Sequence, residues 1–276
     1  MVNLAACSPA SLLSATISDD GVKVTRDVAY APGPRHGLDV YRPDRPAGPL
    51  VVFFYGGSWR SGDKATYPFV ALPLARRGAV VLVADYRVYP EARFPEFLDD
   101  CARAVAWAID HAAALGADPA RVVVMGHSAG AYNAVMLALD PRYLIAAGTS
   151  RDRLAGVVGL AGPYDFLPIT DPDIVPVFAS VHDGPESQPV SHVDGRNPKL
   201  LLLAGSDDTT VEPRNTESLA KRVRAAGGPV ISKLYPGLGH IGMVTAFAPL
   251  FAGRAPVLDD AWAFVRSVSA GNAASR

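Results

Sequence analysis

Short runs of apolar residues alternate along this chain with segments that have the spacing of a helix. Six strands are predicted, over residues 50–55, 79–84, 121–125, 156–161, 199–204 and 231–235, and the first three of them are predicted to be buried. Continuous apolar runs of this length are typical of strands that are covered on both faces. Their alternation with helices predicts an α/β fold, in which a mostly parallel central sheet carries helices on both faces.

Helical spacing accounts for most of the segments between these strands. Helices are predicted over residues 67–77, 97–115, 215–226 and 258–269, with another that begins near Ser128. The first of them should end at Gly78, because glycine is common just after the last turn of a helix. Residues 22–30 and 38–42 alternate apolar and polar side chains, which predicts a hairpin at the edge of the sheet.

Composition limits the classes of protein that remain. The chain has 276 residues, 49% of them hydrophobic, and no repeat or long linker, so residues 21–276 are interpreted as a single domain. A net charge of −1 without a Lys/Arg cluster disfavours a nucleic-acid partner. The sequence has no run of 18 apolar residues, so no membrane span is predicted. Two cysteines, Cys7 and Cys101, are too few for a disulfide framework or a zinc site. No metal or organic cofactor is expected.

The first 20 residues are interpreted as a leader or tether. Residues 4–7 read Leu-Ala-Ala-Cys, the form that bacterial lipoprotein signals have at their cleavage site, but the basic and apolar regions that should precede it are missing. Two interpretations stay open. In one, a trimmed signal would be acylated on Cys7, which predicts membrane attachment through the lipid in the bacterial cell envelope or periplasm. In the other, a short leader belongs to a cytoplasmic protein.

Residues 126–130 read Gly-His-Ser-Ala-Gly directly after a predicted strand and before a predicted helix. Ligands of parallel sheets bind beyond the carboxyl ends of the strands. In that context G-x-S-x-G is a nucleophile motif, because glycines at its two ends let a strained turn hold the serine hydroxyl above the sheet. We therefore predict Ser128 as the nucleophile; the alternative is an ordinary turn in which Ser128 caps the helix.

A serine needs a base, and His240 is the best candidate among six histidines, since it follows the last predicted strand in a loop of small residues. His36 and His111 are predicted to be surface residues, His127 to face away from the base, and His182 and His192 to lie in a Pro/Gly-rich connection. The imidazole in turn needs an acid. Both Asp207 and Asp208 follow a strand, and the pattern G-x-x-D-x-x-V from position 205 to position 211 favours Asp208.

An oxyanion hole requires backbone N–H groups aimed at the attacked carbonyl oxygen. Residues 53–59 read Phe-Phe-Tyr-Gly-Gly-Ser-Trp, and the glycines allow the backbone to approach the substrate closely. We predict that Gly57, Ser58 and Ala129 supply these N–H groups. Tyr55 stands where the corresponding turn often has histidine, and packing and hydrogen bonding by the tyrosine should hold the turn equally well.

The quoted segments, together with "LDVYRP", "VADYRVYPEARFPEFLDD" and "YPGLGHIG", carry a family resemblance. From about Val24 to the last predicted helix, the chain resembles the esterase/lipase-like α/β-hydrolases of the carboxylesterase group. Within that group it is most similar to the branch of BODIPY- and feruloyl-type esterases, near the hormone-sensitive-lipase-like and kynurenine-formamidase-like enzymes. The resemblance implies an α/β-hydrolase fold and the order Ser128, Asp208, His240 for the catalytic residues, with Tyr55 as a departure from the commoner histidine.

The resemblance also implies a cap, and a short one, formed by about residues 163–194. Its candidate pocket walls are Tyr164, Phe166, Phe178 and His182, together with Trp59 beside the glycine turn. A short cap favours short- to medium-chain or aryl carboxylic esters as substrates. An arylformamidase or amidase on the same fold is the alternative within the class, and a non-catalytic binding protein is the alternative outside it. The sequence leaves the oligomeric state open.

Overall fold

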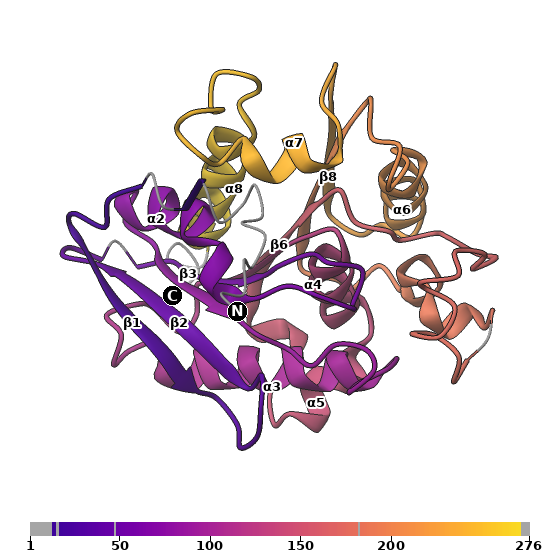
Figure 1. Cartoon of the computed structure of the whole chain (residues 1–276), viewed down its shortest axis with the longest axis horizontal. Coiled ribbons are helices and arrows are strands. Elements are labelled where there is room, and N and C mark those ends of the chain that lie inside the picture. Colours follow the sequence, from indigo (N-terminus) through magenta and orange to yellow (C-terminus); the bar gives the residue numbers. More distant parts are fainter. Residues whose placement is uncertain (1–12, 15–16, 47, 182, 272–276) are drawn as a thin grey trace, which may run out of the picture.

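The structure is a computed structural model that describes residues 13–14, 17–46, 48–181 and 183–271. Cys7, most of the predicted leader and His182 therefore lie outside the described residues. The chain forms one eight-stranded sheet with the order β1-β2-β4-β3-β5-β6-β7-β8 (Figure 1). The strands are β1 (Val22–Ala29), β2 (Gly37–Pro43), β3 (Leu50–Phe54), β4 (Val80–Ala84), β5 (Val122–His127), β6 (Leu154–Leu160), β7 (Lys199–Gly205) and β8 (Val230–Tyr235).

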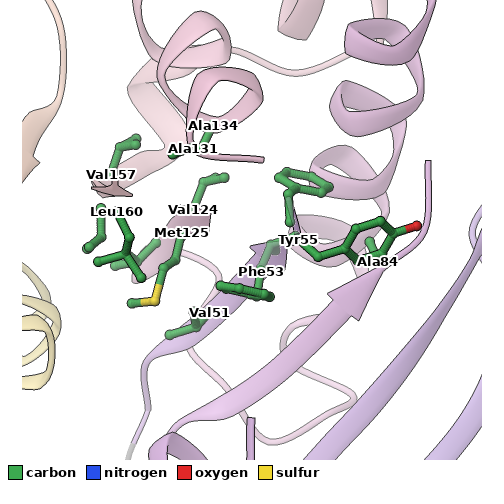
Figure 2. Packing of buried hydrophobic residues seen from close by; sticks show 14 of the residues in the cluster. Val51, Phe53, Tyr55, Ala84, Val124, Met125, Ala131, Ala134, Val157 and Leu160 are labelled. Carbon is green, nitrogen blue, oxygen red and sulfur yellow. The ribbon is translucent and has the colours of Figure 1, made fainter. Parts of the chain in front are cut away.

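Six of the eight strands, β3 to β8, are parallel to one another, and the remaining two form the predicted hairpin. This hairpin extends the sheet because β2 pairs antiparallel with β4, with Leu38–Tyr41 of β2 opposite Val81–Ala84 of β4. Every residue of β3, β4 and β5 is buried, as the continuous apolar runs predicted. Figure 2 shows part of this core, with Ala131 and Ala134 close to Val124 of β5.

The helices cover both faces of the sheet, so the predicted α/β fold is confirmed. They are α2 (Pro68–Arg76), α3 (Glu96–His111), α4 (Ala129–Leu139), α5 (Pro141–Ala146), α6 (Arg214–Ala225), α7 (His240–Thr245) and α8 (Val257–Gly271). In Figure 1, α2 and α8 lie on one side of the sheet and α3, α4 and α5 on the other. Short 3-10 turns occupy Lys64–Thr66, Arg151–Arg153, Pro185–Ser187 and Pro189–His192.

Two short helices, α5 and α7, were not predicted. Each has only six residues, too few to display a helical period, and α7 begins at His240 in what the sequence suggested was a loop. Gly78 behaves as predicted, since it follows α2 with a positive φ of 107° and donates to the Ala75 carbonyl at 2.8 Å. Within the described ranges, no helix is long and apolar enough to cross a bilayer.

The position of His36 contradicts a second prediction. Its side chain was expected at the surface of the hairpin turn, but it is buried, and its Nε2 lies 3.0 Å from Oδ1 of the fully buried Asp100 on α3. Arg87 binds the same carboxylate through two nitrogens, at 2.8 and 2.9 Å. The hairpin therefore packs against α3 through the contact of His36 with the buried Asp100 carboxylate, a long-range contact that local sequence does not reveal.

Candidate active site

Ser128 lies on a strained turn between β5 and α4, with φ at 56° and ψ at −123°. The two flanking glycines are required by close backbone approach. A Cβ on Gly126 would lie 2.1 Å from the carbonyl oxygen of Gly130, and one on Gly130 would lie 2.1 Å from that of Phe54. The Ser128 side chain makes no capping hydrogen bond to the helix, so its hydroxyl is free for another partner.

That partner is His240. Nε2 of His240 lies 2.9 Å from Oγ of Ser128, and its Nδ1 lies 2.8 Å from Oδ2 of Asp208. The three residues are 112 and 32 positions apart in the chain, and they meet because β5, β7 and β8 are parallel and end at the same edge of the sheet. Ser128 and Asp208 are both buried.

The structure distinguishes between the two aspartates that the sequence left as candidates. Burial alone would raise the pKa of Asp208, but the hydrogen bond from His240 and those from the Val211 and Thr210 N–H groups outweigh it and hold the pKa below its ordinary value. Asp208 is therefore an ionised partner of the imidazole. Asp207 is exposed and instead accepts a hydrogen bond from the Ser206 hydroxyl at 2.6 Å.

His127 does not face away from the base, contrary to the prediction. Its ring lies 4.8 Å from the His240 ring, and its Nε2 lies 3.1 Å from the His240 carbonyl oxygen. Burial, followed by the nearby His240, lowers the pKa of His127 to about 3. The side chain is thus a neutral imidazole whose Nε2–H donates to the backbone of the predicted base.

The glycine turn after β3 has three consecutive residues with positive φ: Gly57 at 128°, Ser58 at 54° and Trp59 at 55°. A Cβ on Gly57 would lie 2.3 Å from the Ser61 carbonyl oxygen, so only glycine fits there. Within the described part of the chain, the backbone N–H groups of Gly57, Ser58 and Ala129 donate to no other protein group. Ser58 and Ala129 line the same cavity as Ser128. The Ser58 and Ala129 amides are therefore available to a ligand beside the Ser128 hydroxyl, whereas Gly57 is not among the residues that line the cavity.

Tyr55, directly before this turn, is fixed by packing and hydrogen bonding. Its ring stacks between Tyr67, 5.5 Å away, and Tyr86, 5.0 Å away. Its hydroxyl donates to Oδ1 of Asp85 at 2.6 Å and accepts from the Arg35 guanidinium at 2.9 Å. Figure 2 shows Tyr55 beyond Phe53, at the end of β3.

A cavity of about 310 Å³ opens at Ser128. Its lining residues are Ser58, Trp59, Ser128, Ala129, Pro163, Phe166, Pro168, Ile169, Thr170, Asp171, Ile174, Thr209, Thr210, Val211, Glu212, Arg214 and Asn215. Trp59 and Phe166 therefore lie where the sequence predicted. Tyr164 and Phe178 are not among the lining residues, and both side chains are fully buried. Their aromatic character reflects packing.

The residues that sequence reasoning missed come mainly from two segments. Residues 209–215 follow the aspartate pair, and their position next to Asp208 was the available signal. Residues 168–174 belong to the predicted cap, which consists of irregular chain and two 3-10 turns over its described residues. No group of three or more His, Cys, Asp or Glu side chains in the described ranges is arranged to hold a metal ion.

The sheet order, with candidate functional residues at the carboxyl ends of the parallel strands, defines an α/β-hydrolase fold. The chain belongs to the BD-FAE family, whose model matches residues 38–223. Among curated proteins, the chain is similar to esterase LipC of Mycobacterium tuberculosis, at 32% identity over 78% of this chain and 59% of that protein. It is also similar to an isoprenylcysteine alpha-carbonyl methylesterase of Arabidopsis thaliana, at 27% identity over 86% of this chain and 61% of that protein. The chain thus spans about three fifths of the length of these relatives.

Solved structures show the same fold. Esterase B from Lactobacillus rhamnosis superposes with a TM-score of 0.79 at 20% identity, over 95% of this chain and 91% of that one. A truncated carbohydrate esterase from gut microbiota superposes with a TM-score of 0.78 at 20% identity, over 92% of this chain and 99% of that one. These structural likenesses confirm the predicted α/β-hydrolase fold.

Proposed function

We propose that this chain is a serine carboxylesterase, which hydrolyses short- to medium-chain or aryl carboxylic esters through an acyl-enzyme. The observation that carries the proposal is the continuous hydrogen-bonded path from Ser128 Oγ through His240 to Asp208, with distances of 2.9 and 2.8 Å. A serine hydroxyl becomes an effective nucleophile when a base takes its proton, and an imidazole does so when an acid fixes its tautomer. The esterase names of the similar proteins support this reaction class.

In the first step, His240 Nε2 takes the Ser128 proton while Oγ attacks the ester carbonyl carbon. Asp208 stabilises the imidazolium that forms and remains ionised, in keeping with its lowered pKa. The imidazolium then protonates the leaving alkoxide oxygen, and the alcohol departs from an acyl-Ser128. In the second step, His240 deprotonates a water molecule that attacks the acyl carbon. The imidazolium then protonates Oγ of Ser128 as the bond between Oγ and the acyl carbon breaks, which releases the carboxylic acid and restores the serine and the neutral histidine.

Negative charge develops on the carbonyl oxygen in both tetrahedral intermediates. The N–H groups of Gly57, Ser58 and Ala129 have no other acceptor among the described residues and are the proposed donors to that oxygen. Preorganised backbone donors of this kind contribute roughly 10²- to 10³-fold each to the rate of acyl transfer. The strained backbone around Ser58 is consistent with this role, since strain tends to be stored at functional sites.

The proposed substrate range follows from the cavity. Its volume of about 310 Å³ is at the small end for binding sites of organic molecules, and Trp59 and Phe166 give it an aromatic wall. Short acyl chains or an aryl group would fill such a space, whereas long chains would have to extend past the exposed rim.

The test is hydrolysis of p-nitrophenyl esters from acetate to laurate, by wild type, Ser128→Ala and the surface control Ser191→Ala. We expect wild type and the control to turn over the short esters equally, and Ser128→Ala to lose at least roughly 10³-fold in kcat. Equal rates for wild type and Ser128→Ala would overturn the proposal. An arylformamide measured alongside distinguishes the amidase, because a higher kcat/KM for the formamide than for the matched aryl ester would contradict the ester assignment.

A further inference from the structure

Trp59 is the third residue of the strained turn and is buried, with 3% of its surface exposed. Its indole packs edge-on against Tyr132 and Phe178, with ring centroids 5.0 Å away in each case, and it stacks on Phe97 at 5.8 Å. An apolar ring of similar size would make these same contacts. The indole N–H is therefore a polar group that packing alone does not require.

That N–H donates to Oδ1 of Asn133 at 3.0 Å. Asn133 is fully buried and belongs to α4, the helix that begins immediately after Ser128. Its amide nitrogen lies 3.5 Å from the sulfur of Cys101. A buried polar pair costs free energy to desolvate, and an isolated member of the pair would cost more, so the two residues depend on each other.

The carbonyl groups of Gly57 and Trp59 already have partners. The Gly57 carbonyl accepts from the Arg60 and Ser61 N–H groups at 2.9 and 3.0 Å, and the Trp59 carbonyl accepts from the Tyr89 N–H at 2.7 Å. These bonds fix the shape of the turn itself. Of the described hydrogen bonds, the one from Trp59 to Asn133 is the bond that ties the turn to α4 through a side chain of that helix.

We propose that Asn133 is a positioning residue for the oxyanion hole, and that it acts through the Trp59 indole. The inference rests on the proposed esterase function. Helix α4 would then set both halves of the hole: Ala129 belongs to its first turn, and Asn133, one turn further on, anchors the opposite strand-β3 turn that carries Gly57 and Ser58. The spacing between the two sets of N–H groups is thereby fixed to one rigid element.

This arrangement affects the transition state more than the bound substrate. The hole must match the position of the charged oxygen in the tetrahedral intermediate, so a small shift of the Gly57 and Ser58 amides weakens that state selectively. A displacement of about 1 Å in a catalytic geometry costs on the order of 10²-fold in rate. Loss of the Asn133 bond should therefore lower kcat by roughly 10- to 100-fold and leave KM nearly unchanged.

The experiment is a double-mutant cycle with Asn133→Leu, Trp59→Phe and the double variant, assayed for kcat and KM on p-nitrophenyl butyrate. Asn133→Leu keeps the branching of the side chain and removes the acceptor, whereas Trp59→Phe keeps a ring and removes the donor. We expect the decrease in kcat in each single variant to be almost as large as in the double variant, because either change breaks the same bond. The matched control is Cys101→Ser. Cys101 contacts the amide nitrogen of Asn133 and not the oxygen that accepts from Trp59, so this variant should keep wild-type kcat.

A second readout excludes a merely structural role. A reversible phenylboronic acid, which forms a tetrahedral anion on the nucleophilic serine, should bind Asn133→Leu more weakly by the same factor as the loss in kcat. Asn133→Asp, which restores an acceptor, should recover kcat relative to Asn133→Leu, and it also serves the test if the leucine variant fails to fold. Unchanged kcat in both Asn133 variants, or additive losses in the cycle, would overturn the proposal. Inactive wild-type protein would instead overturn the esterase function on which it rests.

Discussion

The carbonyl oxygen of His240 lies 3.1 Å from Nε2 of His127, the residue immediately before Ser128. Since a carbonyl accepts, His127 must carry its proton on Nε2 and remain neutral, as its lowered pKa of about 3 requires. The residue next to the proposed nucleophile thus holds the backbone of the proposed base. We therefore expect the distance between Ser128 Oγ and His240 Nε2 to depend on this contact as well as on Asp208.

Removing the donor at position 127 should reduce activity. We expect His127→Leu to lower kcat/KM by about tenfold, because the first turn of α7 loses its link to β5 and the base is held less precisely. His127→Gln, which retains an N–H donor, should recover most of the loss. Steady-state kinetics on p-nitrophenyl butyrate measure both. Leucine and glutamine variants of equal activity would show that the hydrogen bond has no role.

The same histidine should make the fold acid-sensitive. Its pKa is about 3 in the folded state and about 6.5 in an unfolded chain, so the unfolded state binds an extra proton below pH 6.5. Stability is therefore lost as the pH falls from about 6.5 towards 3, and the loss between pH 7 and pH 5 is about 2 kcal/mol. His127→Gln should lack this contribution. Urea unfolding at the two pH values checks it, and equal pH dependence in both proteins would contradict the assignment.

Asp208 and Asp207 provide a matched pair of substitutions. Asp208→Asn should lower kcat by up to roughly 10⁴-fold, because an amide no longer fixes the tautomer of His240 or stabilises the imidazolium. Asp207→Asn should leave kcat within about twofold, since its carboxylate is exposed and bonds to Ser206. Equivalent losses in the two variants would show that the contact of 2.8 Å between Asp208 and His240 does not distinguish them functionally.

Gly130→Ala should be strongly destabilising. Its Cβ would lie 2.1 Å from the Phe54 carbonyl oxygen, a backbone atom that cannot rotate away, and overpacking of this kind costs about 1–3 kcal/mol or more. Gly253→Ala is the control, because nothing lies within 4 Å of a Cβ there. Thermal unfolding should show a lower Tm for the first variant and a nearly unchanged Tm for the second. A wild-type Tm for Gly130→Ala would mean that the turn relaxes.

Tyr55→Phe tests the hydrogen bonds that the Tyr55 hydroxyl makes just before the glycine turn. The ring can still stack between Tyr67 and Tyr86, but Oδ1 of the buried Asp85 loses a hydrogen bond of 2.6 Å. We expect a loss of about 1–3 kcal/mol in the free energy of unfolding, with kcat within about twofold of wild type. Chemical denaturation and steady-state kinetics measure the two effects. A large loss of kcat with unchanged stability would give the hydroxyl a role in the chemistry.

Local sequence was sufficient to predict the strands, most of the helices and the positions where chemistry should be sought. Buried parallel strands require continuous apolar runs, and their ends in such a sheet carry the functional side chains, so Ser128, Asp208 and His240 could be named before their distances were known. Glycine at positions 126 and 130 could be explained in advance for a similar reason, since a close backbone approach leaves no room for a side chain.

Contacts between distant segments depend on the tertiary structure. No periodic signal in the chain indicates four of the observed features. They are the contact of His127 with the His240 backbone, the burial of His36 against Asp100, the absence of Tyr164 from the cavity lining, and the hydrogen bond between Trp59 and Asn133, which are 74 residues apart. Which residues lie at the ends of strands can be inferred from the local sequence, because burial imposes apolar residues along a strand and its end is where the apolar run stops. The tertiary structure alone decided which of those side chains meet, because the direction of a side chain is set by packing against elements that are remote in the sequence.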